Sequence, residues 1–212
     1  MKKKKILIVR NSPNEIDPNS YNCQEIGLGK SLVRKGFNCD IVYYSNSLKF
    51  KKETIYEYNK NLLNIIWVKG INVFNNGIYP QLLRKSNIEG YDLIITTEYS
   101  QIMSIYFATF YPQKTIIYHG PYKNNKKILN KIYDYLFLNV LRKKNIKILT
   151  KSKLAENYLK SKGLMNVYTV GVGLDIDNLK KNKEDYEDNN IINNKKGVHF
   201  LYIGKIEERK NV

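Results

Sequence analysis

Two stretches of the sequence place glycine and basic or histidine residues at the end of an apolar run. Residues 198–203 form a run typical of a buried strand, and Gly204 and Lys205 follow it directly, with Lys210 close behind. In α/β proteins a glycine at a strand's end lets the backbone approach a phosphate, and cations at the start of the next helix supply charge. The pattern therefore predicts a phosphate-binding turn at Gly204, Lys205 and Lys210.

The second stretch places a histidine at the tip of a predicted central strand. Residues 115–118 favour a strand, His119 follows them, and Gly120-Pro121 ends the strand at once. An isolated histidine is more often structural than chemical. Ligand contacts in α/β proteins, however, concentrate at the carboxyl ends of the strands. We therefore predict a functional role for His119.

Three more polar residues are candidates for the same edge of the sheet. Asn22 and Glu25 fall on the apolar arc of a predicted helix that ends at Gly36, within its first turn, and Glu98 follows a predicted strand at 91–97. Each has a structural alternative, which is capping of the helix for Asn22 and Glu25 and capping of a loop for Glu98. The two interpretations of Asn22 and Glu25 stay open, and capping is the commoner role for a residue like Glu98.

Elements that would position these residues alternate along the chain. Apolar runs predict strands at 6–9, 39–44, 65–68, 91–97, 115–119, 146–149 and 167–170. Helical periodicity predicts one helix that ends at Gly36, one that begins at Ser152, and three more at 78–85, 99–111 and 124–144. Residues Ile26, Leu28, Gly29, Leu32 and Val33 share one apolar arc of the first helix. Short connections between strand and helix predict an α/β fold, a Rossmann-like parallel sheet with helices on both faces. The polar residues 45–62 are interpreted as a variable insertion.

Composition points to three regions in the chain. Residues 1–175 have the composition of a globular domain, residues 176–197 are charged and asparagine-rich as a linker would be, and residues 198–212 have the pattern of the start of a second domain.

The chain is strongly basic, with 36 Lys and Arg against 19 Asp and Glu, for a formal net charge of +17. Such a charge favours anionic partners such as nucleic acid, anionic lipid or phosphorylated ligands. A genome biased toward lysine codons would also produce it. The cations are scattered, without the aromatic and basic strand motif of an RNA-binding sheet, which disfavours nucleic acid. Cations at the ends of the predicted helix 124–144 suit either an anionic membrane surface or a solvated helix that packs on the core.

The sequence also suggests a compartment. Cys23 and Cys39 have no metal-binding spacing and are too few for a disulfide framework, so a reducing cytosol is the simpler inference. The apolar run 6–9 is too short for a signal peptide, and no segment approaches the ~18 apolar residues that span a bilayer. We expect a cytoplasmic protein that contacts membranes, if at all, peripherally on the inner face.

Taken in order, several short motifs make the chain resemble glycosyltransferase family 4, retaining enzymes with two Rossmann-like domains (the GT-B fold). The matching positions are Leu28, Leu32 and Gly36 at the end of the first helix, His119-Gly120, the run from Leu149 into Ser152, Gly173 and Asp175, and Gly204, Lys205 and Lys210. The resemblance covers essentially the whole chain as the N-terminal domain of such an enzyme and the first strand of the next. The chain departs from the family at Asn19-Ser20, Asn22, Lys205 and Asn211, which replace a glycine pair, Glu, Arg and Gly.

The resemblance implies transfer of a sugar from a nucleotide sugar to a glycan or lipid-linked acceptor, with retention, as in cell-envelope polysaccharide synthesis. It implies that Gly204, Lys205 and Lys210 hold the donor diphosphate, that His119 contacts the sugar, and that no metal or other cofactor takes part. Asn22, Glu25 and Glu98 are then candidates for the acceptor cleft. The paired-glutamate element of the family's second domain is not found in residues 1–212, so we expect this stretch alone to be inactive. The alternative is a basic, non-enzymatic α/β domain that binds nucleic acid or an anionic membrane.

Overall fold

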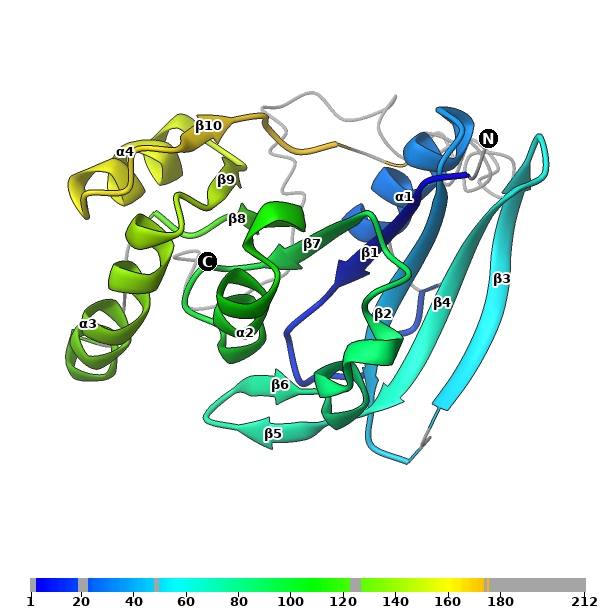
Figure 1. Cartoon of the computed structure of the whole chain (residues 1–212), viewed down its shortest axis with the longest axis horizontal. Helices are drawn as coiled ribbons and strands as arrows, with labels where there is room; N and C mark the ends of the chain where they lie inside the picture. Colours follow the sequence, from blue (N-terminus) through cyan, green and yellow to red (C-terminus); the bar gives the residue numbers. More distant parts are fainter. Residues whose placement is uncertain (1–2, 19–22, 48–49, 123–126, 174, 176–212) are drawn as a thin grey trace, which may run out of the picture.

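The computed structural model describes residues 3–18, 23–47, 50–122, 127–173 and 175, and Figure 1 shows them as one sheet flanked by helices. The strand order in the sheet is β10-β9-β8-β7-β1-β2-β4-β3. Every neighbouring pair is parallel except β3 with β4, which is antiparallel. The strands are β1 (Lys5–Val9), β2 (Asn38–Ser45), β3 (Phe50–Tyr58), β4 (Asn61–Lys69), β7 (Leu93–Thr97), β8 (Thr115–His119), β9 (Lys147–Thr150) and β10 (Val167–Thr169). The predicted Rossmann-like α/β fold is confirmed.

The order of the strands reverses at β1. From β1 the chain moves outward to β2 and to the edge strand β3, and β4 then fits between these two. The chain returns to pair β7 with the other side of β1 and continues outward through β8, β9 and β10. In open α/β sheets a crevice forms at such a reversal, outside the carboxyl ends of the strands. The carboxyl ends of β1 and β7 are therefore where a ligand site is expected.

Helices cover both faces of the sheet because alternate residues of each strand point to opposite sides. Ile6 and Ile8 of β1 pack in a cluster with α1 (Gln24–Arg34), whereas Leu7 and Val9 pack in a cluster with α2 (Ile102–Phe110). The helices α3 (Lys127–Lys143) and α4 (Lys153–Ser161) share a third cluster with α2. One face thus carries α1, and the other carries α2, α3 and α4.

Several local predictions are confirmed almost to the residue. β8 ends at His119, as predicted, and lies inside the sheet between β7 and β9. Ser152 caps α4, because its Oγ accepts a hydrogen bond from the backbone N–H of Ala155 at 3.2 Å. Gly163 follows α4 with a φ of +79°, a left-handed conformation that suits glycine and ends the helix.

Residues 45–62, which were interpreted as a variable insertion, have regular secondary structure that was not predicted. They contain β3 and the start of β4, and β3 lies at the edge of the sheet. Because β3 is exposed along most of its length, it lacks the alternation of apolar and polar residues by which strands are recognised. The register also shifts between Thr54 and Tyr56, which breaks any period of two.

The prediction of a helix at 78–85 is wrong. Ile78 instead ends β6 (Asn76–Ile78), which pairs with β5 (Ile71–Val73) in a separate hairpin, and short 3₁₀ turns follow at Pro80–Leu83 and Lys85–Asn87. Pro80 favours an extended conformation for the residue before it, and Tyr79 accordingly has a φ of −112° and a ψ of 93°. The apolar periodicity there comes from buried Tyr79 and Leu82, which pack on the sheet without a helix.

The first helix is correctly predicted, but Leu28 does not join the core. Ile26, Gly29 and Val33 are buried, whereas Leu28 is 37 % exposed. It lines an apolar groove of about 450 Å³ between α1 and the α1-side face of β7, β8 and β9. Leu28 is exposed because α1 packs over β2 and β4 and does not extend across this half of the sheet.

Several predictions lie outside the described residues. These are Asn22, the linker 176–197, and the start of a second domain at 198–212 with Gly204, Lys205 and Lys210.

Glu156 of α4 joins the helix to the edge of the sheet. Its Oε1 accepts hydrogen bonds from Lys153 Nζ at 2.8 Å and Lys160 Nζ at 2.7 Å, and its Oε2 accepts one from Thr169 Oγ1 at 2.6 Å. These hydrogen bonds lower the pKa of Glu156 from its ordinary 4.5 to about 2. A carboxyl group whose pKa falls on folding stabilises the fold above its unfolded-state pKa.

We therefore expect Glu156 to stabilise the protein above about pH 4.5 and to lose this effect as the pH falls toward 2. Urea denaturation of the wild-type protein and of Glu156→Gln at several pH values measures the effect. The two free energies of unfolding should differ most near neutral pH and converge in acid. Glu57→Gln, at an exposed position of β3, should match the wild type at every pH. A constant difference between Glu156→Gln and wild type across the range would contradict the proposed linkage.

Candidate functional site

A polar cavity of about 230 Å³ lies at the carboxyl edge of the sheet, where the strand order reverses. Its lining comes from segments far apart in the sequence, which are the residues after β1, β7 and β9, the first turn of α1 and the β5–β6 hairpin. The lining residues are Arg10, Ser12, Glu25, Asn75, Thr97, Glu98, Gln101 and Lys151. All of them are polar or charged, so the cavity suits a ligand that makes hydrogen bonds.

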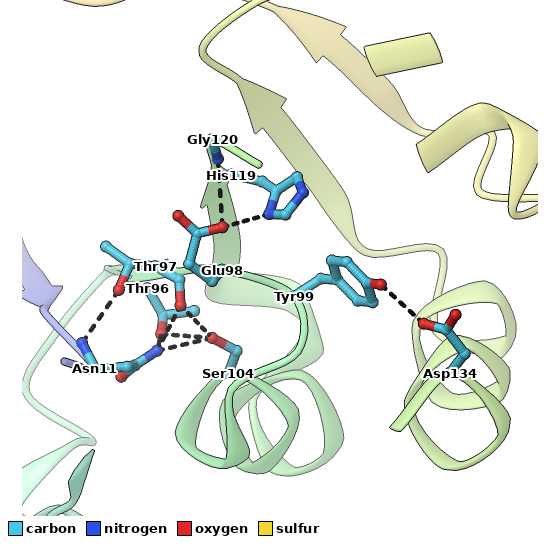
Figure 2. A network of polar contacts seen from close by, with 9 residues as sticks. All are labelled: Asn11, Thr96, Thr97, Glu98, Tyr99, Ser104, His119, Gly120 and Asp134. Atoms are coloured by element: carbon cyan, nitrogen blue, oxygen red, sulfur yellow. Dashed lines mark hydrogen bonds and ion pairs between the residues drawn. The ribbon is translucent and has the colours of Figure 1, made fainter. Parts of the chain in front are cut away.

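Asn11 holds the two central strands together beneath this cavity. Its side chain is buried, and its Nδ2 donates hydrogen bonds to Thr97 O at 2.6 Å, Thr96 Oγ1 at 2.8 Å and Ser104 Oγ at 2.9 Å (Figure 2). The backbone N–H of Asn11 donates to Thr97 Oγ1 at 3.1 Å. The end of β1 is thereby fixed to the end of β7 and to the first turn of α2.

Glu98 and His119 form a carboxylate–imidazole pair across the ends of β7 and β8. Oε2 of Glu98 lies 2.5 Å from Nδ1 of His119 and accepts a hydrogen bond from the backbone N–H of Gly120 at 3.3 Å (Figure 2). Glu98 therefore both caps the loop after β8 and lines the cavity, so the two roles considered for it coexist. Its φ of +63° is left-handed, a strained conformation for a residue that is not glycine and one that often marks functional sites.

His119 lies behind Glu98 and is buried, with only 1 % of its surface exposed. Its ring contacts the ring of Tyr99 edge-on at a centroid distance of 5.1 Å, and Tyr99 donates a hydrogen bond to Asp134 of α3 at 2.8 Å (Figure 2). Burial, together with the Asp134 contact, raises the pKa of the Tyr99 hydroxyl, which stays protonated. Within the described part of the chain, neither ring nitrogen of His119 makes a hydrogen bond of good geometry, although Nδ1 lies against the carboxylate of Glu98.

The β5–β6 hairpin is tied to the segment after β1 and to the start of α2. The backbone N–H of Gly77 donates to Asn11 O at 2.8 Å, and Asn76 Oδ1 accepts a hydrogen bond from the backbone N–H of Ile102 at the start of α2, at 3.0 Å. A Cβ at position 77 would lie 3.0 Å from Asn11 O, a tight contact, so the close approach of the two backbones favours glycine. Figure 1 shows the hairpin below α2, at the same end of the molecule as the tip of β4.

The structure thus brings three of the predicted residues to one edge of the sheet. Glu25 and Glu98 line the cavity, and His119 lies directly behind Glu98. Asn22, Gly204, Lys205 and Lys210 lie outside the described residues, so their predicted roles stay predictions.

Other site residues were missed by sequence reasoning. Arg10, Asn11 and Lys151 directly follow β1 and β9, and this position at a strand's carboxyl end was the signal available in the sequence. Asn75 offered no such signal, because the hairpin that carries it was not predicted.

Two negative findings concern the described residues alone. No group of three or more His, Cys, Asp or Glu side chains there is arranged to hold a metal ion. Cys23 and Cys39 are both buried and form no disulfide bond, and burial raises the pKa of Cys39 well above its usual value. Cys39 is therefore not a reactive thiolate.

A comparison of the chain with protein-family models and with curated proteins finds no match. The resemblance to glycosyltransferase family 4 therefore stays a prediction from the motifs quoted above. What the site can do is inferred from its own residues and their geometry.

We expect Asn11→Ala to destabilise the protein by about 1–3 kcal/mol, because it leaves the buried hydroxyls of Thr96 and Ser104 short of a partner. Asn14→Ala is the matched control, since Asn14 is exposed and its amide bonds only Ser12 among the described residues. Urea denaturation followed by circular dichroism gives both free energies of unfolding. Equal values for the two variants would show that the Asn11 amide does not hold the strand ends together.

Proposed function

We propose that residues 1–175 form the acceptor-side domain of a retaining glycosyltransferase that uses a nucleotide sugar. The observation that carries the proposal is the Glu98–His119 pair at the ends of β7 and β8, beside a polar cavity at the reversal of the strand order. This is the edge where open α/β sheets bind ligands, and His119-Gly120 is one of the motifs behind the resemblance. The left-handed backbone of Glu98 adds support, because such strained conformations cluster at functional sites.

In the proposed reaction the domain acts by positioning and by hydrogen bonding. Glu98 presents its carboxylate to the cavity, and the buried imidazole of His119 behind it holds that carboxylate in place for contact with the sugar. Lys205 and Lys210 neutralise the leaving diphosphate, as the resemblance implies, while the cavity holds the acceptor near the donor. Holding two reactants in place and stabilising the leaving charge are enough to account for large rate enhancements.

A donor screen tests this proposal directly. The complete reading frame of the gene is expressed, and its thermal unfolding is followed with each member of a panel of nucleotide sugars. A donor at 100 times its dissociation constant should stabilise the fold by about 2.7 kcal/mol. His119→Gln and Lys210→Ala should each remove most of this stabilisation, whereas Asn61→Ala, at the amino end of β4, should keep it.

Two outcomes would overturn the transferase proposal. One is that no nucleotide sugar stabilises the wild-type protein. The other is that His119→Gln, shown to be folded by circular dichroism, binds the donor as well as the wild type does.

A second candidate function, attachment to an anionic membrane, is favoured by the surface of α3. Tyr135 is 75 % and Leu136 54 % exposed there, next to exposed Lys131. Exposed apolar side chains beside a cation are typical of helices that lie on a membrane. No described helix has the length and apolar character needed to cross a bilayer, so any such contact is at the surface. This function is compatible with transfer to a lipid-linked acceptor.

The membrane candidate is tested by sedimentation with vesicles of phosphatidylcholine and phosphatidylglycerol. Combining Lys131→Gln, Tyr135→Ser and Leu136→Ser should weaken binding by at least about tenfold, since it removes both a cation and apolar surface. The control combines Phe50→Ser and Lys51→Gln on β3, where the side chains are also exposed, and should bind as the wild type does. Equal binding by both variants would exclude α3 as the contact surface.

A further inference from the structure

Phe74 lies at the tip of the β5–β6 hairpin in a left-handed backbone conformation that is unfavourable for a bulky side chain. Phe74 and Asn75 form the turn with φ angles of +49° and +65°, as in a type I′ turn. Asparagine tolerates this left-handed conformation, but for a bulky side chain it is an outlier. Phe74 is also 78 % exposed, so its ring gains little from burial. A strained and exposed aromatic residue next to a candidate site suggests a ligand contact.

The tip is held in a fixed place relative to the cavity. Besides the bonds of Asn76 and Gly77 described above, the hydroxyl of Tyr79 donates to Arg10 O at 2.5 Å. Asn75 N–H donates to Asn72 Oδ1 at 3.1 Å inside the turn. The bonds of Asn76, Gly77 and Tyr79 anchor β6 and the residue after it to the segment that follows β1 and to the start of α2, and Asn75 itself lines the cavity.

The cavity beside the tip is polar but balanced in charge. The cations Arg10 and Lys151 are matched by the carboxylates of Glu25 and Glu98. Oε1 of Gln101 is a buried acceptor without a hydrogen-bond partner among the described residues. A lining of this kind offers donors and acceptors without net charge, which suits neutral hydroxyl groups better than a phosphate or a nucleic acid.

We propose that Phe74 and this cavity form a saccharide subsite. The C–H face of one sugar ring packs on the exposed ring of Phe74, and its hydroxyl groups bond to Asn75, Gln101 and the carboxylate of Glu98. A rigid aromatic ring next to convergent polar groups is the arrangement by which such a ligand is held and oriented. The inference rests on the proposed transferase function and deepens it, because it makes a sugar the part of the acceptor that is recognised.

NMR signals of the phenylalanine rings test whether a saccharide binds at Phe74. The protein has seven phenylalanines, so a sample with ¹³C-labelled phenylalanine gives few NMR signals, and Phe74→Asn identifies the signal of Phe74. Maltohexaose, cellohexaose, chitohexaose and mannohexaose are added separately at millimolar concentration. At least one should shift the Phe74 signal, and Phe74→Asn should weaken its binding by about tenfold.

Stability separates loss of contact from loss of fold. Asparagine suits the turn better than phenylalanine, so Phe74→Asn should unfold at the same temperature as the wild type or higher. Phe50→Asn, on exposed β3, is the control and should bind the oligosaccharide as the wild type does.

The saccharide proposal is overturned if no oligosaccharide shifts the Phe74 signal, or if Phe74→Asn binds the oligosaccharide as well as the wild type does. It is also overturned if only lipid vesicles shift the signal. Failure of the transferase proposal looks different. In that case no nucleotide sugar stabilises the protein, while an oligosaccharide still shifts the Phe74 signal.

Discussion

The pairing of β1 with β2 on one side and β7 on the other is the constraint on which the rest of the structure depends. Both pairings are parallel, so the carboxyl ends of β1, β2 and β7 lie at the same edge. Because the strand order reverses at β1, the loops that leave this edge diverge to opposite sides and leave room between them. Arg10 and Ser12 on one side and Thr97 and Glu98 on the other meet around that space.

The two edges of the sheet carry different kinds of polar network. At the amino edge, Asp40 is fully buried and bonds Tyr91, Asn64, Lys5 and Lys52. Burial alone would raise the pKa of Asp40, but the hydrogen bonds from Tyr91, Lys5 and Asn64 outweigh it and hold the pKa below its ordinary value. Every group in that network has a partner, as expected of a stabilising one.

The carboxyl edge is less complete. Both ring nitrogens of His119, Oδ1 of Asn11 and Oε1 of Gln101 are buried without a hydrogen bond of good geometry among the described residues, and Glu98 and Phe74 have left-handed backbones. Unmet hydrogen-bonding groups and local strain cost stability, and they are kept where a ligand completes them. The overall charge of +17 does not explain this edge, since its cations and carboxylates are balanced.

The sequence by itself determined the parallel sheet, because buried strands are apolar along their whole length and their ends carry punctuating residues. β8 could be placed from Gly120-Pro121, and α4 from Ser152 and Gly163, because these are local effects of backbone conformation. His119 could be placed at a strand's tip for the same reason.

Only the tertiary structure decided what lies beside His119 and around the cavity. The contact between His119 and Glu98 depends on the register of β7 against β8. The cavity lining depends on the reversal of the strand order at β1. Neither feature produces a local pattern in the sequence. β3 was missed because an exposed edge strand needs no apolar face. The hairpin was missed because its turn places Phe74 where glycine or asparagine is usual. The exposure of Leu28 could not be predicted, because periodicity shows which face of a helix is apolar but not what covers that face.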